Sequence, residues 1–187
     1  RLVHMKPFAD KKITVLGLGG VGGYVGALLA DAYPHVTFVA RGERGRSIRE
    51  KGLVLHSDYR GERTVRPERV VETAESLETQ DYIFICVKNY SLKEACLSLA
   101  GCVSEGTVIV PVMNGADPGD RVREYLPKGT VVDSLIYIVA FANADFSITQ
   151  QDKFANLYVV IQDASAPCWQ KCCDVTDLLN IAGVDCT

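Results

Sequence analysis

Three glycines near the N-terminus have the spacing that nucleotide chemistry requires. Gly17, Gly19 and Gly22 form the pattern G-x-G-x-x-G within the segment Gly17-Leu18-Gly19-Gly20-Val21-Gly22. In this pattern the first glycine makes a tight turn, the second lets a pyrophosphate approach the backbone, and the third lets a helix pack closely on a strand. The free N–H groups of the helix then bind the anion. The segment therefore predicts a dinucleotide-binding turn.

The flanking segments supply the strand and the helix that such a turn needs. Residues 13–16 are a short apolar run, which predicts a strand. In residues 21–32 the apolar side chains recur at the spacing of a helix with one buried face. This strand–turn–helix context favours a dinucleotide site over a glycine-rich turn that serves only packing, which remains the alternative.

A second strand is expected over residues 36–40, and a basic cluster follows it: Arg41, Arg44 and Arg46. A carboxylate directly after this strand would accept a hydrogen bond from the ribose 2′-hydroxyl of NAD. Arg41 offers a guanidinium instead, whose fork of donors matches a 2′-phosphate. The sequence therefore predicts NADP(H) rather than NAD(H) as the cofactor. The alternative is a solvated surface loop rich in arginine.

Lys88 and Asn114 each follow a nearly continuous apolar stretch, over residues 82–87 and 107–112. Such stretches are typical of parallel strands that are buried on both faces. Ligands of an open parallel sheet bind outside the carboxyl ends of its strands. We therefore expect Lys88 and Asn114 to converge with the glycine turn and Arg41 on one crevice. Alternatively, Lys88 extends its stem along a strand end, and Asn114 belongs to a turn.

The remaining segments complete an alternation of strands and helices. We expect strands over residues 53–56, 64–66, 131–139 and 158–161, and helices over 47–51, 91–99, 167–182 and from 118 onward. Ser91 and Glu94 have the spacing of a capping box at the start of their helix. The alternation predicts an α/β fold, a Rossmann-like doubly wound and mostly parallel sheet with helices on both faces. The dinucleotide-binding domain is expected to span residues 12–165.

Composition excludes several other classes of protein. Of the 187 residues, 48% are hydrophobic and 23% are charged, as in globular proteins, and the net charge of −3 opposes binding to nucleic acid or to a membrane surface. No secretory pattern or membrane-spanning run is evident, so we expect a cytoplasmic protein. The seven cysteines form no C-x-x-C pair and do not combine with the histidines at metal-ligand spacing. We expect free thiols and no metal.

The motifs together resemble the N-terminal domain of the ketopantoate reductases (2-dehydropantoate 2-reductases), over residues 12–187. The resemblance rests on G-L-G-G-V-G-G at 17–23, V-A-R-G at 39–42, V-K-N-Y at 87–90 and M-N-G at 113–115. It implies NADPH-dependent reduction of 2-dehydropantoate to pantoate, in pantothenate and coenzyme A biosynthesis. It also implies the cofactor-binding residues Gly17, Leu18, Gly19, Gly20, Val21, Gly22, Arg41, Lys88, Asn114 and Ala140. Lys88 and Asn114 would bind the 2-oxoacid substrate as well.

The resemblance also implies parts that this sequence lacks. Members of the family carry an all-helical C-terminal domain with a proton-donating lysine. We expect residues 166–187 to lead toward such a domain, and the lysine to lie after Thr187. No catalytic residue is then expected within the chain, which would be inactive alone, and homodimerisation of the longer protein remains open. Phe146 stands where the family usually has a glycine.

Two other functions remain compatible with the same residues. One is a different NAD(P)-dependent dehydrogenase of a 2-oxoacid or hydroxyacid, because most substrate contacts would come from outside this chain. The other is a non-catalytic NADP(H)-binding module that senses redox state.

Overall fold

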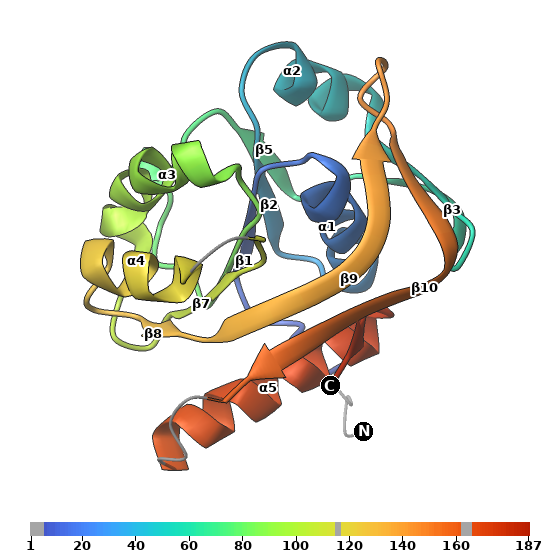
Figure 1. The fold of residues 1–187 in the computed structure, drawn as a ribbon. Coiled ribbons are helices and arrows are strands. Elements are labelled where there is room, and N and C mark those ends of the chain that lie inside the picture. The colour runs from blue at the N-terminus through green and yellow to red at the C-terminus, as the bar shows by residue number, and fades with distance from the viewer. Residues whose placement is uncertain (1–5, 115–116, 162–165) are drawn as a thin grey trace, which may run out of the picture.

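The computed structural model describes residues 6–114, 117–161 and 166–187. Its centre is a six-stranded sheet, here called sheet A, in which every neighbouring pair is parallel (Figure 1). The strand order is β5-β2-β1-β6-β7-β8. The strands are β1 (Ile13–Leu16), β2 (Val36–Val39), β5 (Arg69–Val71), β6 (Tyr82–Ile85), β7 (Val108–Pro111) and β8 (Thr130–Val131). Because the order runs outward in both directions from β1 and β6, the predicted doubly wound sheet is confirmed.

Helices cover both faces of sheet A, as predicted (Figure 1). They are α1 (Gly20–Ala32), α2 (Gly42–Lys51), α3 (Leu92–Leu99), α4 (Pro118–Tyr125) and α5 (Ala166–Ala182), with 3-10 turns η1 (Ala74–Ser76), η2 (Asn89–Ser91) and η3 (Ala100–Cys102). In β6, Tyr82 and Phe84 join the core under α1 and α5, whereas Ile83 and Ile85 join the core under α3 and α4. This alternation explains why the strand is apolar throughout.

A second sheet, here called sheet B, lies beyond α1. Its strand order is β11-β10-β3-β4, and β9 pairs antiparallel with β10. The strands are β3 (Leu53–Ser57), β4 (Gly61–Val65), β9 (Asp133–Ala142), β10 (Ile148–Val160) and β11 (Asp185–Cys186). The strand expected over residues 158–161 is thus only the end of a much longer one. Its first part is mostly polar at 149–153 and bulges between Gln151 and Asn156, so no apolar run revealed it.

Helix α1 is enclosed between the two sheets, so the prediction of one buried face was wrong. Every residue from Gly22 to Leu29 is buried. A Cβ at Gly26 would lie 3.2 Å from the ring of Phe38 in β2, and a Cβ at Gly23 would collide with Ile148 in β10. Glycines on opposite sides of the helix thus let both sheets approach it, which apolar spacing alone does not indicate.

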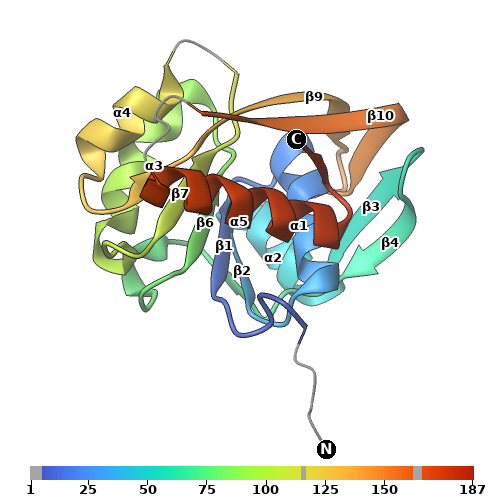
Figure 2. The ribbon, with the colours of Figure 1, turned by 90° about the horizontal axis from the view of Figure 1, so that it is seen from below.

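Helix α5 packs beside α1 across the same core (Figure 2). Leu178 and Leu179 are fully buried, and the Tyr33 hydroxyl donates a 2.6 Å hydrogen bond to the Leu178 carbonyl oxygen. After α5 the chain adds β11 to the edge of sheet B, parallel to β10. Residue 165 lies outside the described residues, and the expected division of the chain at that point stays a prediction.

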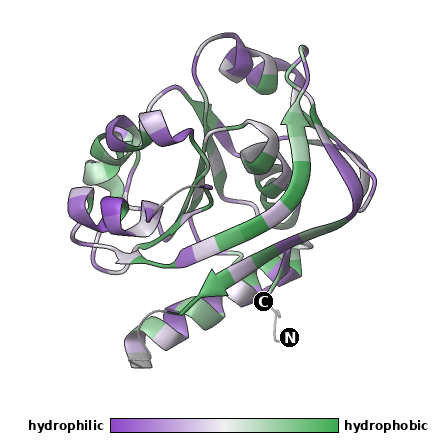
Figure 3. Ribbon diagram, in the orientation of Figure 1, coloured by the Kyte–Doolittle hydropathy of each residue, from purple (hydrophilic) through white to green (hydrophobic). Residues whose placement is uncertain are grey.

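Two features of the β9–β10 hairpin stand out. Strand β9 is apolar over most of its length (Figure 3). Its exposed side chains include Leu135, Tyr137, Val139 and Phe141. At the hairpin turn, Phe146 has a φ of 68°, a left-handed conformation that favours glycine. Its ring lies 5.7 Å from the guanidinium carbon of Arg44 in α2, a cation–π contact that helps hold the turn there.

Candidate cofactor-binding site

The turn between β1 and α1 is built by backbone contacts that only glycine allows. Gly17 has a φ of +87°, and a Cβ there would lie 2.6 Å from the Cys86 carbonyl oxygen after β6. A Cβ at Gly22 would collide with the carbonyl oxygen of Gly17. The helix therefore starts directly against the strand, as the spacing of the glycines predicts.

The N-terminus of α1 faces open space. A Cβ at Gly19 would have no atom within 4 Å. Gly19 is the N-cap residue, no side chain caps the helix, and its first turn carries no acidic residue. The uncapped N–H groups and the helix dipole make this terminus attractive to an anion. A pyrophosphate is the anion that a glycine turn of this kind accommodates.

Strand β9 closes the other side of the turn. A Cβ at Gly20 would collide with the carbonyl oxygen of Ala140 in β9. Ala140, which the sequence places more than 100 residues from the turn, is thus its direct neighbour. The contact is through backbone, so a residue larger than glycine at position 20 would push the strand away.

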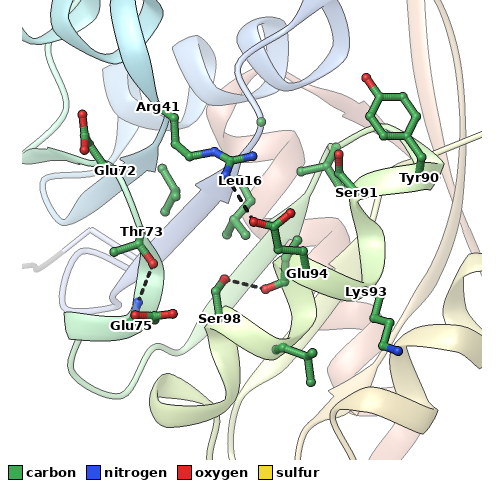
Figure 4. Close-up of a pocket in the computed structure, with 15 residues that line it drawn as sticks. Leu16, Arg41, Glu72, Thr73, Glu75, Tyr90, Ser91, Lys93, Glu94 and Ser98 are labelled. Carbon is green, nitrogen blue, oxygen red and sulfur yellow. Dashed lines mark hydrogen bonds and ion pairs between the residues drawn. The ribbon is translucent and has the colours of Figure 1, made fainter.

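A cavity of about 570 Å³ opens beside the turn, at the carboxyl ends of β1, β2 and β5 (Figure 4). Gly17 and Arg41 both line it, so the structure brings these two predicted residues together. The other lining residues are Leu16, Val39, Glu72, Thr73, Glu75, Val87, Tyr90, Ser91, Lys93, Glu94, Ala95, Leu97 and Ser98. Helix α3 forms the wall opposite Arg41.

Arg41 is the N-cap residue of α2, which begins at Gly42 and not near residue 47 as expected. Gly42 and Gly45, poor helix formers, concealed this start. Across the cavity, Arg41 Nη1 donates to Glu94 Oε1 at 3.2 Å. The capping-box prediction for Ser91 and Glu94 was wrong, because Ser91 makes no side-chain cap and Glu94 instead faces the arginine.

Lys88 and Asn114 lie on the same edge of sheet A, beside this cavity rather than in its lining. Both are exposed. Asn89 connects them, since its side-chain amide donates a 2.9 Å hydrogen bond to the Asn114 carbonyl oxygen. Gly115, the last residue of the M-N-G motif, lies outside the described residues. The predicted site residues thus fall into two neighbouring groups, one around Arg41 and one around Asn114.

Sequence reasoning missed three lining residues of the cavity, two of them acidic. Glu72, Thr73 and Glu75 follow β5, a strand of three half-buried residues that no apolar run announces. Thr73 caps the short η1 turn by accepting a 3.3 Å hydrogen bond from the Glu75 N–H. Their position could have revealed them. Residues that directly follow a parallel strand beside β2 lie at the same edge of sheet A as Arg41.

The part of the chain that the structure describes contains no cluster of three or more His, Cys, Asp or Glu side chains arranged to hold a metal. None of its helices is both long and apolar enough to cross a bilayer. All seven cysteines are free. Burial raises the pKa of Cys86, directly beneath the glycine turn, to about 12.

Comparison with known proteins identifies the family. The model of the family "Ketopantoate reductase PanE/ApbA" matches residues 13–162. The chain belongs to this family. It is a family of NAD(P)-dependent oxidoreductases that act on small 2-oxoacids. The match covers sheet A, the glycine turn and both groups of predicted site residues.

Individual relatives agree with this assignment. The chain is 31% identical over 147 residues to the 2-dehydropantoate 2-reductase of Mesorhizobium japonicum, covering 67% of this chain and 44% of that protein. It is 32% identical over 127 residues to the uncharacterized oxidoreductase YkpB of Bacillus subtilis, covering 68% and 41%. The structure of 2-dehydropantoate 2-reductase from Porphyromonas gingivalis superimposes with a TM-score of 0.81 at 32% identity, covering 95% and 63%. The chain thus spans less than half the length of these two curated relatives.

Proposed function

We propose that this chain is the cofactor-binding part of an NADPH-dependent 2-dehydropantoate reductase, which yields pantoate for coenzyme A synthesis. The observation that carries the proposal is the cavity in which Arg41 lies beside the glycine turn. A dinucleotide needs an anion site for its pyrophosphate and, if it is NADPH, a cation for its 2′-phosphate. Family membership supplies the reaction class.

The proposed binding mode follows the edge of sheet A. The pyrophosphate lies on the segment Gly17-Leu18-Gly19-Gly20-Val21-Gly22, against the N–H groups at the start of α1. The adenosine occupies the cavity, and Arg41 pairs with the 2′-phosphate. The nicotinamide then points the other way, toward Ala140, Lys88 and Asn114. Lys88 and Asn114 would also contact the substrate carboxylate and ketone.

Hydride transfer requires a proton donor for the alkoxide that forms. Asn114 cannot serve, because an amide does not give up a proton in this way. Lys88 is an ammonium group, but the resemblance to the ketopantoate reductases places the donating lysine after Thr187, so we assign no general acid among residues 1–187. We therefore propose that the donor comes from a part of the enzyme outside this chain. We also propose a cytoplasmic location, since free thiols suit a reducing compartment.

Titration of the 187-residue chain with NADPH, followed by nicotinamide fluorescence, tests the binding part of the proposal. Saturable binding without consumption of NADPH is expected when 2-dehydropantoate is added. Absence of NADPH binding would contradict the proposal, and turnover by this chain alone would show that the acid lies within it.

The substrate needs a separate test, because one relative at 32% identity is an oxidoreductase without a stated substrate. The full-length gene product that contains this chain is expressed, and its oxidation of NADPH is measured with a panel of 2-oxoacids. We expect the highest kcat/KM with 2-dehydropantoate. A higher kcat/KM with another 2-oxoacid would contradict 2-dehydropantoate as the substrate without affecting the proposed cofactor.

A further inference from the structure

The cavity beside the glycine turn carries more acidic than basic side chains. The carboxylates of Glu72, Glu75 and Glu94 line it, against the cations Arg41 and Lys93. A site that binds only NADPH has no use for a carboxylate next to its 2′-phosphate ligand, because the two anions repel each other. Binding of the 2′-phosphate therefore does not explain why acidic side chains line this cavity.

Glu94 differs from the other two carboxylates because it contacts Arg41 directly. Figure 4 shows the two side chains pointing toward each other across the cavity, Arg41 from the N-cap of α2 and Glu94 from α3. Their N–O distance is 3.2 Å, and the side chains are 70% and 74% exposed. Glu94 thus forms an ion pair with the same guanidinium that a 2′-phosphate would need to bind.

Exposure decides how strong this contact is. An ion pair in water is screened and weak, so a phosphate with up to two negative charges and several acceptor oxygens can displace the carboxylate. The displacement still breaks the Arg41–Glu94 ion pair, and it leaves the Glu94 carboxylate near the negatively charged phosphate. A cofactor with a 2′-hydroxyl requires neither change.

We propose that Glu94 determines how strongly the site prefers NADPH over NADH. It holds Arg41 across the cavity in the absence of cofactor and competes with the 2′-phosphate for the guanidinium. NADPH binding breaks the Arg41–Glu94 pair, whereas NADH binding leaves it in place. The preference for NADPH is consequently smaller than Arg41 alone would give. This inference rests on the proposed function, and it adds a specificity-determining residue on the wall opposite Arg41.

The test compares Glu94→Gln with Glu75→Gln, a matched control that removes a charge from the same cavity without touching Arg41. Dissociation constants for NADPH and NADH are measured for each form, with 2′-AMP and 5′-AMP as probes of the phosphate position. Glu94→Gln should tighten NADPH and 2′-AMP binding roughly three- to tenfold, given the strength of exposed ion pairs and the repulsion removed. NADH and 5′-AMP should change less than about twofold, and Glu75→Gln should leave the NADPH/NADH ratio within about twofold.

The double variant Arg41→Ala/Glu94→Gln separates a role through Arg41 from a general charge effect. In the Arg41→Ala background, adding Glu94→Gln should improve the NADPH/NADH ratio clearly less than in the wild-type background, because it then removes only the repulsion between Glu94 and the phosphate. An unchanged or lower ratio in Glu94→Gln alone, or an equal gain in both backgrounds, would overturn the inference while wild-type NADPH binding keeps the proposed function intact. Failure of the wild-type chain to bind either dinucleotide would instead overturn both.

Discussion

The two sides of the candidate cofactor site are built by different forces. On one side, Gly17, Gly20 and Gly22 bring backbone against backbone, and an added Cβ at any of them would meet a carbonyl group. On the other side, Arg41 and Glu94 form an exposed ion pair that spans the cavity. A larger side chain at any of these three glycines would disturb the packing. Changes of charge at Arg41 or Glu94 would alter binding with little effect on the stability of the fold.

The contrast also separates folding from binding. Close packing makes the glycine turn part of the core, so its substitutions act on stability. Screened charges contribute little to stability, so substitutions on the Arg41 side act on the cofactor. Gly19 is the informative exception on the first side, because it belongs to the turn but faces open space.

The largest effect is expected for Gly22→Ala. The new methyl group would collide with the Gly17 carbonyl oxygen and with Cys86, so the free energy of unfolding should fall by about 3 kcal/mol. Urea denaturation measures the change. Gly101→Ala is the matched control, because a Cβ there has no atom within 4 Å, and it should change stability by less than about 1 kcal/mol. Equal stability of both variants would show that the turn is not tightly packed.

Gly19→Val should leave the fold intact and abolish cofactor binding. Its side chain enters the space where the pyrophosphate would lie, so NADPH and NADH should both bind roughly 100-fold more weakly or not at all. The free energy of unfolding should fall by less than about 1 kcal/mol. Fluorescence titration and urea denaturation of the same sample give both values. Retained affinity would place the pyrophosphate elsewhere.

Arg41→Ala should affect one cofactor and not the other. Loss of a charge-assisted contact to the 2′-phosphate should weaken NADPH binding roughly 10- to 100-fold, with NADH affinity changed less than about threefold. Stability should be unaffected because the ion pair to Glu94 is exposed. Equal losses for NADPH and NADH would remove the 2′-phosphate from Arg41.

The smallest perturbation is alkylation of the thiols in the folded wild-type chain at pH 8. Since the thiolate is the reactive form, a raised pKa slows labelling. Burial raises the pKa of Cys86 to about 12, and the pKa values of Cys96 and Cys102 to about 11. Cys86, Cys168 and Cys173 are all partly exposed, so the raised pKa of Cys86 decides between them, and mass spectrometry should find label first on Cys168 and Cys173. Labelling of Cys86 should increase only as the pH rises further, and rapid labelling at pH 8 would indicate a loose turn.

Much of sheet A was predictable from local patterns. The strands β1, β2, β6 and β7 are apolar runs because both their faces are buried, and the spacing of the glycines predicted how α1 begins. Sheet B was only partly predictable. The long polar part of β10 owes its conformation to pairing with β9 and β3, which no local periodicity records.

The candidate site shows the same limit. Arg41 was predicted as a ligand because its position after a strand depends on nearby sequence. Its contact with Glu94 spans 53 positions and exists only because β2 and α3 meet at one edge of the folded sheet. From the sequence alone, Glu94 was predicted only as half of a capping box, and its contact with Arg41 became evident only in the three-dimensional arrangement.

A crystal structure of this chain with NADPH bound tests the proposed site most directly. The pyrophosphate should lie within hydrogen-bonding distance of the N–H groups at the start of α1, and the 2′-phosphate should contact Arg41 in place of Glu94. A dinucleotide bound away from the glycine turn, or a 2′-phosphate that leaves the Arg41–Glu94 pair unbroken, would contradict the proposal.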